Sequence, residues 1–135
     1  MKKSICLVAL AAVLLFVGCP SPAGGGSSQD PIVGTWNFAS ATVTSSITGT
    51  TVSVSLADLG LLSDVFTVKS DKTFVETLTA IGGATTSISG TWTATTSGYT
   101  GTANGITLSA TVVSGSLTIT EIVGTDTRVT VYTKS

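Results

Sequence analysis

The stretch NGITLSATVVSGSLTITEIVGTDTRVTVYT, residues 104–133, decides the fold. Apolar residues occupy every second position in much of it, as at Ile106 and Leu108, and Thr or Ser lies between them. This alternation is typical of β-strands that bury one face. The pair Asn104-Gly105 is a strong hairpin signal, because a two-residue type I′ turn needs positive φ at both positions. The stretch therefore predicts consecutive antiparallel strands joined by short turns.

The same pattern extends toward the N-terminus. The segment TTVSVSL at 50–56 alternates in the same way, and Gly, Asn, Asp and Ser punctuate the chain between the apolar runs. We expect eight or nine strands in residues 31–135, which is enough chain for one domain with a modest core. So many consecutive strands favour an all-β, antiparallel up-and-down meander barrel, because closure removes the exposed sheet edges. A two-sheet sandwich remains the alternative.

One segment departs from the strand pattern. In SLADLGLLSD, residues 55–64, leucines recur every three residues at Leu56, Leu59 and Leu62. Ser55 and Asp58 have the spacing of a capping pair at a helix start. The segment predicts one short helical piece near 56–63, lying over an open end of the sheet. The remaining carboxylates, Asp64 among them, are expected mostly in turns, where Asp satisfies backbone N–H groups.

The N-terminus has the features of a secretion signal. Lys2 and Lys3 precede an apolar run that is too short to span a bilayer comfortably, and the run ends at FVGC, residues 16–19. FVGC resembles a bacterial lipobox, which implies a signal peptide at 1–18 and a diacylglyceryl group on Cys19. Residues 19–30, rich in Pro, Gly and Ser, predict a flexible tether. Ordinary secretion with cleavage elsewhere and an uncleaved anchor are the alternatives.

The N-terminal signal and the composition of the chain lead to expectations about location and chemistry. Lipid on Cys19 would hold the protein to a membrane of the bacterial cell envelope, and we expect the outer membrane or cell surface rather than the inner membrane. Without Lys2 and Lys3 the chain keeps four basic and seven acidic residues, a net charge of −3, so nucleic acid is not an expected partner. The chain has no His, which removes the usual catalytic base and metal ligand. We expect no enzyme activity, no metal and no cofactor.

A family resemblance sharpens the fold prediction. In PIVGTWNF, residues 31–38, Gly34-Thr35-Trp36 resembles the G-x-W signature on the first strand of lipocalins and fatty-acid-binding proteins, the calycin superfamily. The segments FTVKSDKTFVETL and SGTWTATTSG look like strands of small bacterial lipocalin-like lipoproteins. The resemblance implies a barrel plugged at one end by Trp36, with a basic side chain of the last strand across the indole. Arg128 is the first candidate for that side chain and Lys134 the second. Trp92, in a second Gly-Thr-Trp triplet, is expected to be core.

Three residues are candidates for ligand binding. Glu76 shares a strand face with Phe74, so Glu76 points inward if Phe74 does. Arg128 and Tyr132, four residues apart, also share a face. Fatty-acid-binding proteins hold a ligand carboxylate with an inward Arg and Tyr near the C-terminus, at a spacing of two residues. In the alternative interpretation, Glu76 and Arg128 lie at the surface or barrel end, paired with solvent or with each other.

Two functions are compatible with these residues. The first is a lipid-anchored module that binds a small apolar or amphiphilic ligand in the barrel mouth. The second is a non-enzymatic scaffold or interaction protein with a filled barrel and no ligand, whose protein partner the sequence does not identify. A small barrel of eight strands can nearly be filled by its own side chains. An internal void near Glu76 or Arg128 would favour binding, and a filled interior would favour the scaffold.

Overall fold

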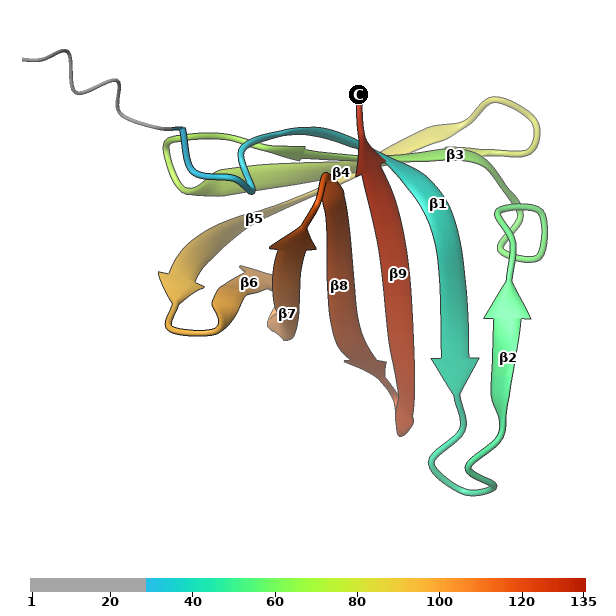
Figure 1. The fold of residues 1–135 in the computed structure, drawn as a ribbon. Helices are drawn as coiled ribbons and strands as arrows, with labels where there is room; N and C mark the ends of the chain where they lie inside the picture. The colour runs from blue at the N-terminus through green and yellow to red at the C-terminus, as the bar shows by residue number, and fades with distance from the viewer. Residues whose placement is uncertain (1–28) are drawn as a thin grey trace, which may run out of the picture.

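The computed structural model describes residues 29–135, which form nine β-strands (Figure 1). The predicted signal peptide, Cys19 and the tether up to residue 28 lie outside the described residues. The strands are β1 (Gly34–Thr44), β2 (Thr51–Val54), β3 (Leu61–Val68), β4 (Thr73–Ala80), β5 (Thr85–Thr95), β6 (Gly98–Ala103), β7 (Ile106–Val113), β8 (Ser116–Val123) and β9 (Asp126–Lys134).

The strands form a closed antiparallel barrel. Strands β3 to β9 pair in sequence order, β3 pairs with β1, and β9 pairs back with β1 over residues 36–44. This closure confirms the predicted meander barrel, which eight strands close, and excludes the sandwich. The remaining strand, β2, lies outside this closed set and pairs only with residues 41–44 of β1. All of these pairings lie between Gly34 and Lys134, so the hydrogen bonding of the barrel is complete within the described residues.

The predicted helical piece near 56–63 is wrong. Residues 56–60 form consecutive turns, and β3 begins at Leu61. The capping pair exists, since Asp58 Oδ2 accepts from Ser55 N at 2.8 Å and Ser55 Oγ accepts from Asp58 N at 3.2 Å. However, Gly60 adopts φ of +71° and ends the turn. A helix through residue 63 would also break the pairing of Leu61 and Ser63 with β4.

The order of the strands gives the barrel two distinct ends. Residues 29–33 enter next to the C-terminus, while the β1–β2 and β8–β9 turns lie at the opposite end (Figure 1). Because neighbouring strands are antiparallel, the β4–β5 and β6–β7 turns lie with the second group. We call the end that contains Trp36 the closed end. The mouth is the end formed by residues 45–50, 55–60, 81–84, 104–105 and 124–125.

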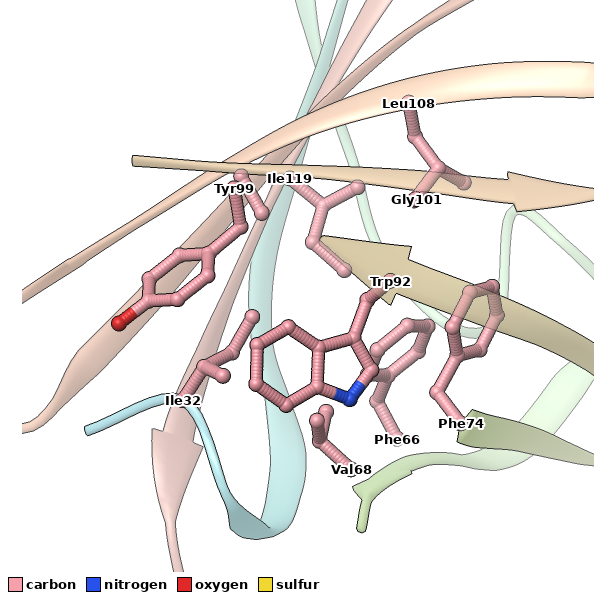
Figure 2. Close-up of a pocket in the computed structure, with 10 residues that line it drawn as sticks. Ile32, Phe66, Val68, Phe74, Trp92, Tyr99, Gly101, Leu108 and Ile119 are labelled. Carbon is pink, nitrogen blue, oxygen red and sulfur yellow. The ribbon is translucent and has the colours of Figure 1, made fainter. Parts of the chain in front are cut away.

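Aromatic side chains fill the closed end. Figure 2 shows Trp92 surrounded by Ile32, Phe66, Phe74 and Ile119, and the rings of Phe66 and Phe74 stack with centroids 4.8 Å apart. The cavity left between these residues has a volume of about 10 Å³. That volume holds at most one water molecule. This half of the barrel is therefore a packed core.

Trp36 plugs the closed end and is completely buried. Its indole N–H donates to the Ile32 carbonyl oxygen at 2.8 Å, and Lys134 Nζ lies 5.2 Å from the ring centroid. The prediction that Arg128 covers Trp36 is wrong, and the second candidate, Lys134, takes that place because it pairs with Trp36 across β1 and β9. A Cβ atom on Gly34 would lie 2.8 Å from Lys134 Cε, so the glycine of the motif makes room for the lysine stem.

The second Gly-Thr-Trp triplet repeats this arrangement. Trp92 is buried, its indole N–H donates to the Lys69 carbonyl oxygen at 3.0 Å, and Lys72 Nζ lies 3.8 Å from the ring centroid. A Cβ atom on Gly90 would lie 2.4 Å from Phe74 Cζ. Each triplet thus combines a buried indole, a backbone acceptor, a covering lysine and a glycine that admits a close neighbour. A lysine over an indole contributes about 0.5–2 kcal/mol.

Replacing Trp36 with Ala should lower the free energy of unfolding by about 3–5 kcal/mol, because it removes a large and completely buried side chain from the core. Urea unfolding followed by circular dichroism measures the change. The control is Ile47→Ala, because Ile47 is 87% exposed and its truncation should change stability by less than about 0.5 kcal/mol. A folded Trp36→Ala protein with unchanged stability would contradict the plugged barrel.

Candidate functional site

The half of the barrel toward the mouth is hollow. One cavity of about 220 Å³ is lined by Phe74, Ile106 and Leu108, and a second of about 230 Å³ is lined by Leu61 and Asp64. Both cavities are also lined by the same three residues: Glu76, Ile88 and Arg128. The two cavities adjoin at these residues, and we call them together the hollow and each of them one of its arms. It is more than twenty times larger than the space left in the packed core.

Strand alternation brings the polar side chains of the hollow inward. Arg128 pairs directly with Glu121 across β8 and β9, in the register that favours contact between opposite charges. Glu76 faces Phe66 across β3 and β4, and Asp64 lies two residues before Phe66 on β3. Tyr132 lies four residues after Arg128 on β9, two inward-facing positions closer to the packed core. Asp64, Glu76, Glu121, Arg128 and Tyr132 form the polar cluster, which extends from the edge of the packed core at Tyr132 toward the mouth at Arg128.

Hydrogen bonds divide the cluster into two groups. The Tyr132 hydroxyl donates to Asp64 Oδ2 at 2.9 Å and lies 3.5 Å from Glu76 Oε1. The Arg128 guanidinium forms its ion pair with Glu121 instead. Asp64 is 6% exposed, and its Oδ1 atom is buried without a hydrogen-bond partner. One carboxylate oxygen in the cluster is thus left without a donor.

Burial raises the pKa values of the two carboxyl groups beside Tyr132, those of Asp64 and Glu76. Burial, together with the nearby charge of Asp64, raises the pKa of Glu76 to about 7, against the opposing effect of Arg128. Burial also raises the pKa of Asp64, opposed by the hydrogen bond from Tyr132. The pKa of Tyr132 is raised chiefly by burial. Near neutral pH, Glu76 therefore exchanges its proton while Tyr132 remains a hydrogen-bond donor.

Of the three residues that the sequence pointed to, Glu76 and Arg128 line the hollow, and Tyr132 is buried behind it with its hydroxyl 3.5 Å from Glu76 Oε1. It does not pair Glu76 with Arg128, because Glu121 takes the guanidinium. Asp64 and Glu121 were not among the predicted site residues. Asp64 was expected in a turn but lies within β3, and its alternation with Phe66 and Val68 is the signal that could have placed it inward.

The side chains around the hollow offer both polar and apolar contacts. Among residues 29–135, no group of three metal-ligand side chains is arranged to hold a metal ion. The side chains present offer a hydroxyl, three carboxyls, a guanidinium and apolar walls. Such a set can hold a polar head by hydrogen bonds and ion pairs, with an apolar body against Ile88 and Leu108.

Comparison of the chain with family models, with curated proteins and with solved structures found no match. The antiparallel barrel of eight strands is consistent with a lipocalin-like fold. In the part of the chain that the structure describes, no helix is long and apolar enough to span a membrane.

The raised pKa of Glu76 predicts that stability falls with rising pH. Folded Glu76 keeps its proton up to about pH 7, whereas the unfolded chain releases it near its ordinary pKa of 4.5. The contribution of Glu76 is therefore fully present below pH 4.5 and is lost as pH rises through 7. The loss should be about 1–3 kcal/mol. The raised pKa of Asp64 acts in the same direction.

Urea unfolding at pH 5 and pH 8 measures this effect, and Glu76→Gln should remove most of the difference. The matched control is Asp71→Asn, which removes a carboxylate on the exposed turn at the closed end and should keep the pH dependence. Equal stability of the unmodified protein at the two pH values would show that Glu76 is not a buried weak acid.

Proposed function

We propose that this protein is a membrane-anchored bacterial lipoprotein whose lipocalin-like barrel binds a small amphiphilic ligand in the hollow. The observation that carries the proposal is the contrast between the two halves of one barrel. Aromatic residues leave about 10 Å³ at the closed end, whereas about 220 Å³ and 230 Å³ remain empty in the two arms of the hollow. A barrel that served only as a scaffold would gain stability by filling that volume.

The walls of the hollow suit a ligand with two kinds of surface. Ile88, Ile106 and Leu108 offer apolar contact, and the polar cluster offers hydrogen bonds at the inner end. Burial of an apolar chain is worth about 0.8 kcal/mol for each CH₂ group removed from water. The volume limits the ligand to a small molecule.

The mouth is rimmed by exposed apolar side chains, one in or beside each of its five connections. These side chains are Ile47, Leu59, Ile81, Ile106 and Val123, which are 37–87% exposed. Exposed apolar groups that gather around one opening are typical of binding grooves. The rim therefore supports entry of an apolar or amphiphilic molecule through the mouth.

The G-x-W arrangement supports membership of the calycin superfamily. Gly34, buried Trp36 and a covering basic side chain from the last strand are the features that the resemblance implies, with Lys134 in the basic role. The attachment point of the tether also suits an anchored protein. Asp30 accepts a hydrogen bond from the Tyr99 hydroxyl at 2.6 Å, which ties the start of the domain to the closed end. A lipid on Cys19 would therefore pull on the closed end and leave the mouth free.

Replacing Cys19 with Ala should abolish membrane attachment, because the sulfur that accepts the lipid is lost. Fractionation of cells and the intact mass of the protein measure the outcome. The variant should leave the membrane fraction or accumulate with its signal peptide uncleaved. The control is Cys6→Ala, a cysteine inside the predicted signal peptide, which should leave attachment unchanged. A Cys19→Ala protein of normal mature mass in the membrane would contradict the lipoprotein proposal.

Octanol should bind saturably to residues 20–135, which contain the whole barrel, and shift the amide resonances of Glu76, Ile88 and Leu108 in NMR spectra. A ligand this small is expected to bind in the millimolar range. Ile88→Trp, which puts a larger side chain at a residue that lines both arms, should abolish the shifts. Val113→Trp is the control, because Val113 is 67% exposed. Shifts that survive in Ile88→Trp would place octanol elsewhere and contradict the proposed site.

A further inference from the structure

The polar cluster of the hollow has more negative than positive groups. Asp64, Glu76 and Glu121 supply three carboxyls, and Arg128 supplies the single cation among the residues that line the two arms. Arg128 is already engaged by Glu121 in an ion pair. Asp64 and Glu76 are therefore left without a cationic partner of their own.

The cluster is also short of hydrogen-bond donors. The Tyr132 hydroxyl has one proton, and it donates to Asp64 Oδ2 while Glu76 Oε1 lies farther away at 3.5 Å. Asp64 is only 6% exposed, and its Oδ1 atom has no hydrogen-bond partner. Buried carboxylate oxygens are normally satisfied, because leaving them bare costs free energy. Asp64 lines one arm of the hollow, so a donor bound in that arm is close to the carboxyl that lacks one.

We propose that the hollow binds a small primary amine with an apolar body, whose ammonium group lies against Asp64 and Glu76 while the apolar body contacts Ile88 and Leu108. This inference rests on the proposed function and specifies its ligand class. An ammonium group brings the positive charge and three donors, which is what the two carboxyls lack. Tyr132 keeps its bond to Asp64 and fixes that carboxyl in place.

A fatty acid is the opposite choice, and the cluster disfavours it. Its carboxylate would need Arg128, which Glu121 already holds, and it would enter a site where Asp64 and Glu76 are negative or neutral. Like charges at short distance repel, and the repulsion grows when water is excluded. The inward Arg and Tyr of the sequence prediction are thus present, but the carboxyls around them reverse the preference.

Binding of an amine should strengthen as pH rises through 7. An alkylamine keeps its proton in this range, since its pKa resembles the lysine value of about 10.4. Glu76, with its pKa of about 7, changes from neutral to negative over the same range. The other ionisable groups that face this position are Asp64, Glu121, Arg128 and Tyr132. A neutral ligand should show no such increase.

Titration of residues 20–135 with octylamine, octanol and octanoate at pH 8, followed by NMR, tests the inference. The three probes share one apolar chain and differ in head-group charge. Octylamine should bind at least 10-fold tighter than octanol, and octanoate more weakly than octanol. Octanol or octanoate binding as tightly as octylamine would overturn the amine while leaving the proposed function standing. If no probe binds, both fail.

Variants of single carboxyl groups test which of them bind the ammonium group. Glu76→Gln should weaken octylamine binding at least 5-fold at pH 8 and remove its pH dependence. Asp64→Asn should weaken it too. Asp71→Asn, which removes the same charge from an exposed turn, is the control and should bind normally. Equal octylamine affinity in Glu76→Gln and the unmodified protein would overturn the inference. Displacement of octylamine by an equal concentration of Ca²⁺ would also overturn it, by assigning the cluster to a metal cation.

Discussion

Pairing between β1 and β9 is the interaction on which the rest of the structure depends. It extends along residues 36–44 and joins the first strand of the meander to the last, so no long edge remains on either. Closure fixes the size of the interior, because eight strands enclose a space that side chains can nearly fill. Its register also decides which side chains meet. Trp36 faces Lys134 at the closed end, and Val43 faces Arg128 near the mouth, seven residues and roughly 20 Å farther along β1.

The inward-facing side chains differ between the two halves of this enclosed space. Toward the closed end the inward positions carry Trp36, Phe66, Phe74 and Trp92, and little space remains. Toward the mouth the inward positions carry carboxyls and an arginine in place of large apolar groups. Polar side chains cannot close on each other as aromatic rings do, because their charges need donors or solvent. The packed half supplies the stability that lets the other half stay hollow.

Much of this could be predicted from the chain alone. Alternating apolar residues and turn signals give the strands, and Glu76 and Tyr132 follow from the faces they share with neighbours. The errors have physical causes. The three-residue spacing of Leu56, Leu59 and Leu62 resembles that of a helix. The pairing of β3 with β1 and β4 stabilises the chain more than the single capped turn at Ser55 does, so the strand begins at Leu61. Asp64 sits in β3 although aspartate favours turns. Whether Lys134 or Arg128 covers Trp36 depends on the register between β1 and β9. These are the first and last strands of the domain, so no local sequence pattern indicates that register.

The central claim is that the mouth half of this barrel is a ligand site. The most direct test is native mass spectrometry of residues 20–135, purified gently from the cells that make the protein. We expect a reproducible added mass that leaves on mild activation and is missing from the Ile88→Trp variant prepared in the same way. A bare mass in every preparation, or an added mass that Ile88→Trp retains, would contradict a ligand site in the hollow.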